Sequence, residues 1–280
     1  LLKLRKELGL FANIRPVKMF QSLIKNSPLK ENIVKGTDLV IFRELTGGIY
    51  FGEKHISVDG TVASDLCEYS EKEISRIAHM AFKAAKKRKK KLTLVDKANV
   101  LESSRLWRKT VTEIGKSYPE VKFECMFIDN AAVQMMLKPS QFDVILTDNM
   151  FGDILSDQGS VIIGSVGLLP SASIGANNAM FEPFHGSYPQ AKGKNIANPV
   201  ASIFSTAMLL QHFGLDEEAN AIVFAVHESF AKKVVTADIL GSNKYGTDYV
   251  GDFISEHIVD SDENLNINDE NIGLGKSTII

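Results

Sequence analysis

The sequence predicts an α/β fold with a mixed or parallel sheet, because short β-rich runs alternate with helical stretches along most of its length. Apolar residues recur every three or four positions in the helical stretches, and the strand candidates are short runs rich in β-branched and aromatic residues. Neither the dinucleotide fingerprint G-x-G-x-x-G after a strand nor the phosphate-binding pattern G-x-x-x-x-G-K-[ST] occurs.

The strand candidates are residues 38–42, 92–95, 121–128 and 142–146. Helices are expected over 70–90, 104–117, from Gly152 onward, and over 199–213 and 216–233, with a further helical pattern at Leu1, Leu4 and Leu8. Ser70 and Glu73 predict a capping box at the start of the 70–90 helix, whose buried face would hold Ile74, Ile77, Ala78, Ala81 and Ala85. Residues 164–189 are expected to be rich in loops, and 259–280 to form a polar tail.

Composition bounds the class of protein. A chain of 280 residues with 44% hydrophobic and 24% charged residues is typical of a globular protein with a sizeable core. The net charge of -2 argues against a nucleic-acid partner. No apolar run approaches the roughly 20 residues that span a bilayer, so no membrane partner is expected. Two widely spaced cysteines, Cys67 and Cys125, indicate a reducing compartment, and we expect a cytoplasmic protein.

Two carboxylates directly follow the apolar run DVILTDNM. Asp153 and Asp157, in FGDILSD, share one face of the expected helix and can reach a single cation. Hard divalent cations prefer such oxygen ligands. The alternative is an ordinary first helical turn in which Asp153 favours the helix dipole. Asp129, after FECMFI, could add a third carboxylate, although Asp129–Asn130 is also good turn chemistry.

Other candidates also have ordinary structural alternatives. Arg5, Arg15 and Arg43 would suit a substrate with two carboxylates, or are scattered surface arginines. Lys97, in DKANVL, could transfer protons or form a surface ion pair. Tyr50 follows two glycines that allow close approach to a ligand, or packs as an aromatic in a turn. The loop residues that could approach a nucleotide, or form a plain turn, are His185, Gly186 and Ser187.

Taken together, the motifs resemble the β-decarboxylating dehydrogenases, the isocitrate/isopropylmalate dehydrogenase family, and its isopropylmalate branch in particular. The stretches that carry this resemblance occur in the family's order: LLKLRK, LFANIRP, RELTGGIYFGE, DKANVLESSRLWRKTV, FDVILTDNMFGDILSD, GLLPSAS, FEPFHGS and NIANP. The resemblance runs from Leu1 to about residue 258, and it implies that a further segment of the family precedes Leu1.

The resemblance implies the family's two-domain α/β fold with a mixed sheet, which is not a Rossmann fold. It places 1–10 and 164–258 in a discontinuous nucleotide-binding domain and 11–163 in a domain for dimerisation and catalysis. A segment near 48–69 would form an arm that interlocks two subunits. The active form would be a homodimer with shared active sites.

The resemblance also implies roles for individual residues. Tyr50 and Lys97 match the family's acid–base pair, with Lys97 reaching in from the partner subunit. Asp153 and Asp157 match ligands of Mg²⁺ or Mn²⁺, joined by Asp129 from the partner. The matches to substrate-binding positions are Arg5, Arg15, Arg43, Asp129, Leu1, Leu2 and Val100, and those to NAD-binding positions are Asn99, His185, Gly186, Ser187 and Asn198.

The expected reaction is the NAD-dependent oxidative decarboxylation of 3-isopropylmalate to 2-oxoisocaproate, a step of leucine biosynthesis. Leu1 and Leu2 suit an isopropyl group, whereas isocitrate would need polar partners. Gln190 stands where NAD-using members commonly have Asp, which accepts from the ribose 2′-hydroxyl and repels a 2′-phosphate. Asp148 stands where the family commonly has a small or uncharged residue. The alternatives are a related enzyme acting on another malate-type substrate, a non-catalytic binding or assembly protein, and a phosphate-binding α/β enzyme.

Overall fold

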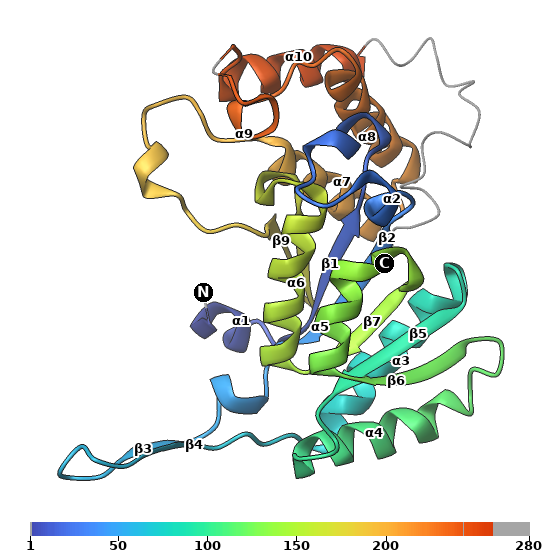
Figure 1. The fold of residues 1–280 in the computed structure, drawn as a ribbon, viewed down its shortest axis with the longest axis vertical. Helices are drawn as coiled ribbons and strands as arrows, with labels where there is room; N and C mark the ends of the chain where they lie inside the picture. The colour runs from blue at the N-terminus through green and yellow to red at the C-terminus, as the bar shows by residue number, and fades with distance from the viewer. Residues whose placement is uncertain (1, 243, 260–280) are drawn as a thin grey trace. The chain divides into compact units, whose positions relative to one another are not determined.

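The structure is a computed structural model that describes residues 2–242 and 244–259. Seven strands form the main sheet, in the order β6-β5-β7-β2-β1-β8-β9 (Figure 1). Helices alternate with these strands along the chain, so the predicted α/β fold is confirmed. None of the helices in this part of the chain is long and apolar enough to cross a membrane. Leu1 and the predicted tail from residue 260 lie outside the described residues.

The chain divides into two compact units. Among the described residues, the first comprises 2–14, 39–158 and 173–180, and the second comprises 15–38, 159–172, 181–242 and 244–259. The strands β1 (Leu10–Lys18), β8 (Pro170–Gly175) and β9 (Ala179–Pro183) and helix α6 (Asn149–Ile163) each contain residues of both units. This division differs from the expected domains, because residues 15–38 fall in the second unit. The domain boundaries implied by the resemblance stay a prediction.

The first unit holds most of the sheet and the helices packed on it. Its strands are β5 (Lys91–Asp96), β6 (Lys122–Phe127), β7 (Val144–Thr147) and, apart from its first residue, β2 (Asp38–Glu44). Its helices are α1 (Leu2–Glu7), η2 (Gly48–Tyr50), α3 (Glu71–Lys87), α4 (Glu102–Gly115), α5 (Ile128–Leu137) and η3 (Pro139–Gln141). The pairs β2–β7, β5–β7 and β5–β6 are parallel, so β2, β5, β6 and β7 run in one direction and end at the same edge of the sheet.

Helix α3 shows how the local sequence determines an element. The Ser70 hydroxyl accepts from the Glu73 amide, and the Glu73 carboxylate accepts from the Ser70 amide, so the predicted capping box is present. The predicted apolar face is buried against α4, β5 and β7, with no exposed surface at Ile74, Ile77, Ala78, Ala81 or Ala85. Beyond the helix, the side chain of Arg88 forms a buried ion pair with Asp143 at 2.7 Å. The helix expected over 70–90 therefore ends at Lys87, and β5 begins at Lys91.

A separate two-stranded hairpin lies in the segment expected to form the arm. Strands β3 (Lys54–Ile56) and β4 (Ala63–Asp65) pair antiparallel, and all six of their residues are exposed (Figure 1). Ile56 and Val62 are 64% and 62% exposed. The hairpin therefore presents apolar side chains on a ribbon that has no core of its own within the first unit.

The second unit is mainly helical. Its elements are η1 (Gln21–Asn26), α2 (Glu31–Val34), η4 (Val166–Leu168), η5 (Pro189–Ala191), α7 (Val200–His212), α8 (Asp216–Ala231), α9 (Ala237–Leu240) and α10 (Thr247–Val259). Helix α8 packs against both α7 and α10. The ring of Phe20 stacks on Phe204 at 5.5 Å and meets Phe230 edge-on at 5.1 Å, which joins α7 and α8 through one aromatic cluster.

Three sequence-based expectations about elements are wrong. The 164–189 stretch contains strands β8 and β9, because the buried side chains of β8 are small, such as Ser171 and Ala172, and give no apolar run. Asp129 lies in the first turn of α5 rather than in a free turn. Helix α6 begins at Asn149, not Gly152, because the Asp148 carboxylate accepts from the Phe151 amide at 2.9 Å and caps the earlier start.

Candidate functional site

Three of the predicted site residues meet in the first unit. The Arg43 guanidinium, at the end of β2, pairs with the Asp153 carboxylate on α6. The Tyr50 hydroxyl, at the end of η2, donates to Asp153 Oδ2 at 2.9 Å, and the Arg43 guanidinium lies 5.6 Å from the centre of the Tyr50 ring. A cation, a carboxylate and a phenol therefore form one cluster at the end of β2, the edge where parallel sheets hold ligands.

Gly152 allows this cluster to form. A Cβ at this position would lie 2.7 Å from both Cβ and Cγ of Arg43, closer than side chains tolerate. Glycine therefore lets α6 approach β2 closely enough for Asp153 to reach the guanidinium. The sequence reasoning did not assign Gly152 a role, although FGD is part of the quoted motif.

Burial shifts the acid–base behaviour of the cluster. Desolvation lowers the pKa of Arg43, opposed by the charge of Asp153 and reinforced by the positive charge of Arg5. Desolvation, followed by the hydrogen bond to Asp153, raises the pKa of Tyr50, so the phenol holds its proton. Arg5 itself is only 7% exposed on α1. Two predicted substrate arginines, Arg5 and Arg43, thus act electrostatically on one another.

Lys97 and Asp129 form a second group in the first unit. The Lys97 ammonium pairs with the Asp129 carboxylate, whose pKa is lowered by that hydrogen bond. Asp96, the neighbour of Lys97, instead accepts two hydrogen bonds from Arg108, at 2.7 and 2.9 Å. The Lys97 backbone is held by the Ser104 hydroxyl, which accepts from its amide at 3.1 Å. The two residues predicted to reach into a partner's site therefore sit together in one chain.

The predicted metal ligands come together only in part within one chain. Among the described residues, no three His, Cys, Asp or Glu side chains gather where they could hold a metal ion. The prediction needs only Asp153 and Asp157 from one chain and takes Asp129 from the partner subunit. Asp153 is partly exposed and Asp157 exposed, one turn apart on α6. Their carboxylate oxygens are the donors that Mg²⁺ and Mn²⁺ prefer, so this half of the site fits such an ion.

Asp148 adds a buried acid near the cluster. Its side chain is 8% exposed, and desolvation raises its pKa to about 7. The sequence identified Asp148 as a departure from the family pattern without assigning a role. The structure shows that it caps α6 through the Phe151 amide.

In the second unit, the predicted nucleotide-binding residues line one open pocket of about 1000 Å³. His185, Gly186, Ser187 and Asn198 all contribute to its wall. This volume suits a nucleotide-sized ligand, and a Cβ at Gly186 would meet no neighbouring atom, so the loop leaves room beside its backbone. The pocket therefore fits part of a dinucleotide.

Asp238 organises this pocket and was not among the predicted site residues. One carboxylate oxygen accepts from the Ser165 hydroxyl and from Asn198 Nδ2, the latter at 2.9 Å. The other oxygen accepts from the Thr236 hydroxyl at 2.5 Å. Asn198 Oδ1 in turn accepts from the Val200 amide at 3.0 Å. No sequence motif marked Asp238, because its partners are up to 73 positions away.

The remaining predicted residues are distributed as follows. Arg15, on β1, is 6% exposed, and its guanidinium lies 4.4 Å from the centre of the Phe184 ring. Asn99 and Val100 are exposed in the loop that follows β5. Gln190 lies exposed in η5, between two residues that line the nucleotide-sized pocket. Leu2 is the first residue of α1.

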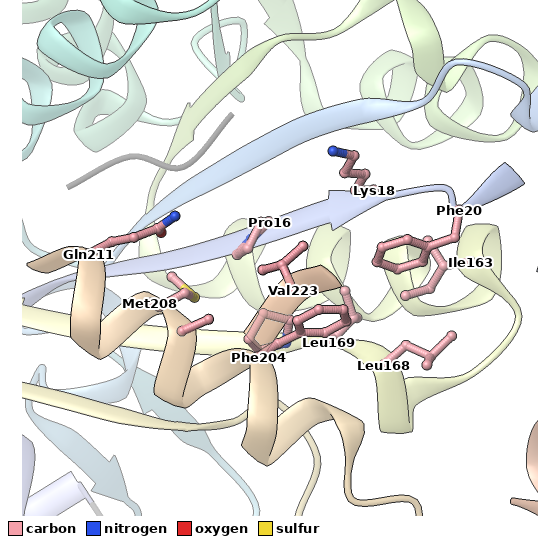
Figure 2. A pocket seen from close by; sticks show the side chains of 12 residues that line it. Pro16, Lys18, Phe20, Ile163, Leu168, Leu169, Phe204, Met208, Gln211 and Val223 are labelled. Carbon is pink, nitrogen blue, oxygen red and sulfur yellow. The ribbon is translucent and has the colours of Figure 1, made fainter. Parts of the chain in front are cut away.

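A second cavity lies among apolar side chains of the second unit (Figure 2). Its volume is about 30 Å³, and Phe20, Phe204 and Val223 form part of its wall. This space holds little more than a water molecule. It is therefore too small to be a site for a substrate.

Nearly the whole chain is similar to known proteins. Residues 1–254 match the family described as isocitrate/isopropylmalate dehydrogenase. The chain is 53% identical over 260 residues to a 3-isopropylmalate dehydrogenase of Bacteroides fragilis, covering 92% of this chain and 73% of that protein. It is 50% identical over 264 residues to the protein of the same name from Aquifex aeolicus, covering 92% and 72%.

Solved structures give the same picture. The fold matches an isocitrate dehydrogenase from Methylococcus capsulatus with a TM-score of 0.85 and 38% identity, covering 92% of this chain and 76% of that one. It also matches the TT0538 protein of Thermus thermophilus with a TM-score of 0.85 and 32% identity, covering 98% and 53%.

Proposed function

Because this chain belongs to the isocitrate/isopropylmalate dehydrogenase family, we propose that it oxidises and decarboxylates 3-isopropylmalate to 2-oxoisocaproate, with reduction of NAD⁺, in leucine biosynthesis. Relatives that are 50–53% identical carry the name 3-isopropylmalate dehydrogenase, whereas the isocitrate dehydrogenase with a similar fold is 38% identical. The observation that carries the proposal is the Arg43–Asp153–Tyr50 cluster, because it joins a group for a carboxylate, a candidate metal ligand and an acid.

The arginines would bind the diacid. Guanidinium groups form two parallel hydrogen bonds with a carboxylate, and Arg43 and Arg5 are both buried, so they keep their charge away from bulk water. Arg15 is the third such group. Holding both carboxylates would fix C2 and C3 of the substrate for reaction, which is the role of positioning in catalysis.

Two cofactors are part of this proposal. Asp153 and Asp157, with Asp129 of the other subunit, would hold Mg²⁺ or Mn²⁺, while His185, Gly186, Ser187, Asn198 and Asn99 would bind NAD⁺. When bound, the metal ion would supply a positive charge that polarises the 2-hydroxyl and stabilises the developing enolate, and NAD⁺ would supply the acceptor for the hydride from C2. The chain's own residues would transfer the protons.

The proton transfers would use Lys97 and Tyr50. Lys97, delivered by the partner subunit, accepts the proton of the 2-hydroxyl as C2 becomes a ketone. The C3 carboxylate then leaves as CO₂, and its bonding electrons form the C2–C3 double bond of an enolate whose negative charge lies on the C2 oxygen. Tyr50 donates its proton to C3, which yields 2-oxoisocaproate. Burial and the hydrogen bond to Asp153 raise the pKa of Tyr50, so the phenol still holds the proton that it would donate when the enolate forms.

The homodimer follows from the same reasoning. As the resemblance to the family implies, each active site would combine the Lys97–Asp129 pair of one subunit with the Arg43–Asp153–Tyr50 cluster of the other. The exposed apolar hairpin β3–β4 supports a role as the arm that joins the subunits. We place this dimer in the cytoplasm, in line with the two widely spaced cysteines.

The test is a spectrophotometric assay with purified full-length protein, Mg²⁺ and NAD⁺. Formation of NADH is followed with isopropylmalate, isocitrate and malate as separate substrates, and omission of the metal with added chelator is the control. The proposal expects the highest kcat/KM with isopropylmalate. A preference for isocitrate would assign the chain to the other branch of the family, and no NADH with any diacid would defeat the enzymatic proposal.

A further inference from the structure

We propose that Asn149 is a positioning residue that sets the substrate-binding Arg43 and the turn carrying Tyr50 with a single side-chain amide. This inference rests on the proposed function for the roles of Arg43 and Tyr50. No sequence motif assigned a role to Asn149. The observations that carry it are the bonds of a buried amide that no solvent reaches, since Asn149 is 1% exposed.

The two ends of the amide face different parts of the site. Asn149 Oδ1 accepts from Arg43 Nε at 3.0 Å, and Asn149 Nδ2 donates to the Gly47 carbonyl at 3.1 Å. The backbone amide of Asn149 donates to the Tyr69 hydroxyl at 2.9 Å, which fixes the start of α6. A carboxamide carries an acceptor and a donor on one planar group, whereas an ionised carboxylate of the same size can only accept.

The contact to Arg43 fixes the orientation of its guanidinium. Nε is held by Asn149, while a terminal nitrogen pairs with Asp153. A planar guanidinium held at two of its three nitrogens cannot rotate about its last bonds without breaking one contact. Because the Asn149 contact does not involve Asp153, it keeps the guanidinium in place even when the Asp153 carboxylate binds another partner.

The contact to Gly47 fixes the turn that precedes Tyr50. The Gly47 carbonyl accepts from Asn149, and its amide donates to Glu44 Oε2 at 2.7 Å. A Cβ at Gly47 would lie 2.8 Å from the Tyr69 ring, so the turn packs closely on that side as well. The next amide, of Gly48, donates to the Glu68 carbonyl at 2.9 Å. Tyr50 follows within the same 3-10 turn, so its position is set by these bonds.

The test compares Asn149→Asp, Asn149→Ala and Asn13→Ala. Asp is nearly isosteric and keeps an acceptor for Arg43, but cannot donate to Gly47; Ala loses both contacts. Asn13 is the matched control, because it is another fully buried Asn of the first unit and its amide contacts Ser173 instead. Asn149→Ala is expected to raise KM for isopropylmalate and to lower kcat, with a loss in kcat/KM of about 10²-fold.

The Asp variant separates a positioning role from a merely structural one. It should lower kcat more than it raises KM, because the Tyr50 turn loses its bond while Arg43 keeps a partner. Kinetic constants of both Asn149 variants that match those of Asn13→Ala would overturn the inference. If the Ala variant does not fold, the Asp variant decides alone.

Amide hydrogen exchange keeps this outcome distinct from that of the proposed function. Residues 46–50 should exchange faster in both Asn149 variants than in the wild type and in Asn13→Ala, whatever the activity. If the wild type forms no NADH but residues 46–50 exchange faster in the Asn149 variants, the proposed function is wrong and the role of Asn149 in positioning the turn is still supported. Unchanged exchange at 46–50 would overturn the inference even in an active enzyme.

Discussion

The Tyr50 hydroxyl donates to Asp153 Oδ2 at 2.9 Å although the two residues are 103 positions apart. Burial and this hydrogen bond raise the pKa of Tyr50, which makes it an acid rather than a base near neutral pH. Tyr50→Phe should therefore lower kcat by about 10² to 10⁴-fold, the usual contribution of a general acid, with a much smaller change in KM. Tyr118→Phe, which removes a hydroxyl bonded to His79, is the control. Equal kcat in the two variants would remove Tyr50 from the proton-transfer step.

Lys97→Met should greatly reduce turnover, because the 2-hydroxyl would lose its proton acceptor. Lys116→Met removes an exposed lysine paired with Glu113 and should leave kcat unchanged. Steady-state kinetics of both variants with isopropylmalate and NAD⁺ provide the measurement. Near-normal turnover in Lys97→Met would exclude the role proposed for this lysine.

The raised pKa of Asp148 predicts that the free energy of unfolding depends on pH. Burial raises its pKa from 3.8 to about 7. Between these values the folded chain keeps a proton that the unfolded chain has released, so the free energy of unfolding falls as the pH rises through this window. Asp148→Asn cannot ionise and should be more stable than the wild type at pH 8, by up to a few kcal/mol, but not at pH 4.

Urea denaturation of the wild type and of Asp148→Asn at several pH values between 4 and 8 measures this difference. Because all other titrating groups are shared, only the difference between the two proteins matters. A difference that stays constant with pH would show that Asp148 ionises in the folded protein as it does in the unfolded chain.

Asp238→Asn should weaken NAD⁺ binding. The carboxylate accepts three hydrogen bonds, from Ser165, Asn198 and Thr236. An amide in its place has an NH₂ group where one carboxylate oxygen was, so at least one of these three donors loses its acceptor. The loss of a hydrogen bond to a charged group predicts a rise in KM for NAD⁺ of about 10-fold or more, with kcat at saturating NAD⁺ largely retained. Asp248→Asn, at an exposed contact with Asn195, should not change KM.

Gln190→Asp should sharpen the preference for NAD⁺ over NADP⁺. Gln190 carries no charge that repels a 2′-phosphate, and the added carboxylate would supply it while accepting from a 2′-hydroxyl. The ratio of kcat/KM for the two cofactors is the measurement. A ratio that does not change would show that the side chain at 190 does not reach the ribose.

The sequence predicted those elements whose own residues determine them. Helix α3 has an apolar face and a capping box within one segment, so its pattern is complete without the rest of the chain. Strand β8 could not be recognised, because burial of small residues such as Ser171 and Ser173 depends on neighbours and leaves no apolar run. Helix α5 was missed for a similar reason. The Asp129–Asn130 pair by itself favours a turn, and only the fold shows that it lies in the first turn of a helix that directly follows β6.

The candidate site divides in the same way. Tyr50, Lys97 and Asp153 could be named because they lie in ordered motifs that resemble one family. The pairings Arg43–Asp153 and Lys97–Asp129 could not, since they join residues 110 and 32 positions apart. Asn149, Gly152 and Asp238 act through groups that the fold brings to them, and nothing in their local sequence indicates which groups these are.

The open hairpin β3–β4 has a consequence for the newly made protein. A two-stranded ribbon alone is at best marginally stable in water, and this one exposes Ile56, Val58 and Val62. If it serves as the arm of a dimer, every newly made chain exposes an apolar hairpin that is prone to aggregation and open to proteases until it binds a second copy. The lifetime of the unassembled chain depends on the concentration of other copies. A larger fraction of the chains should therefore be degraded before they dimerise at low expression than at high expression.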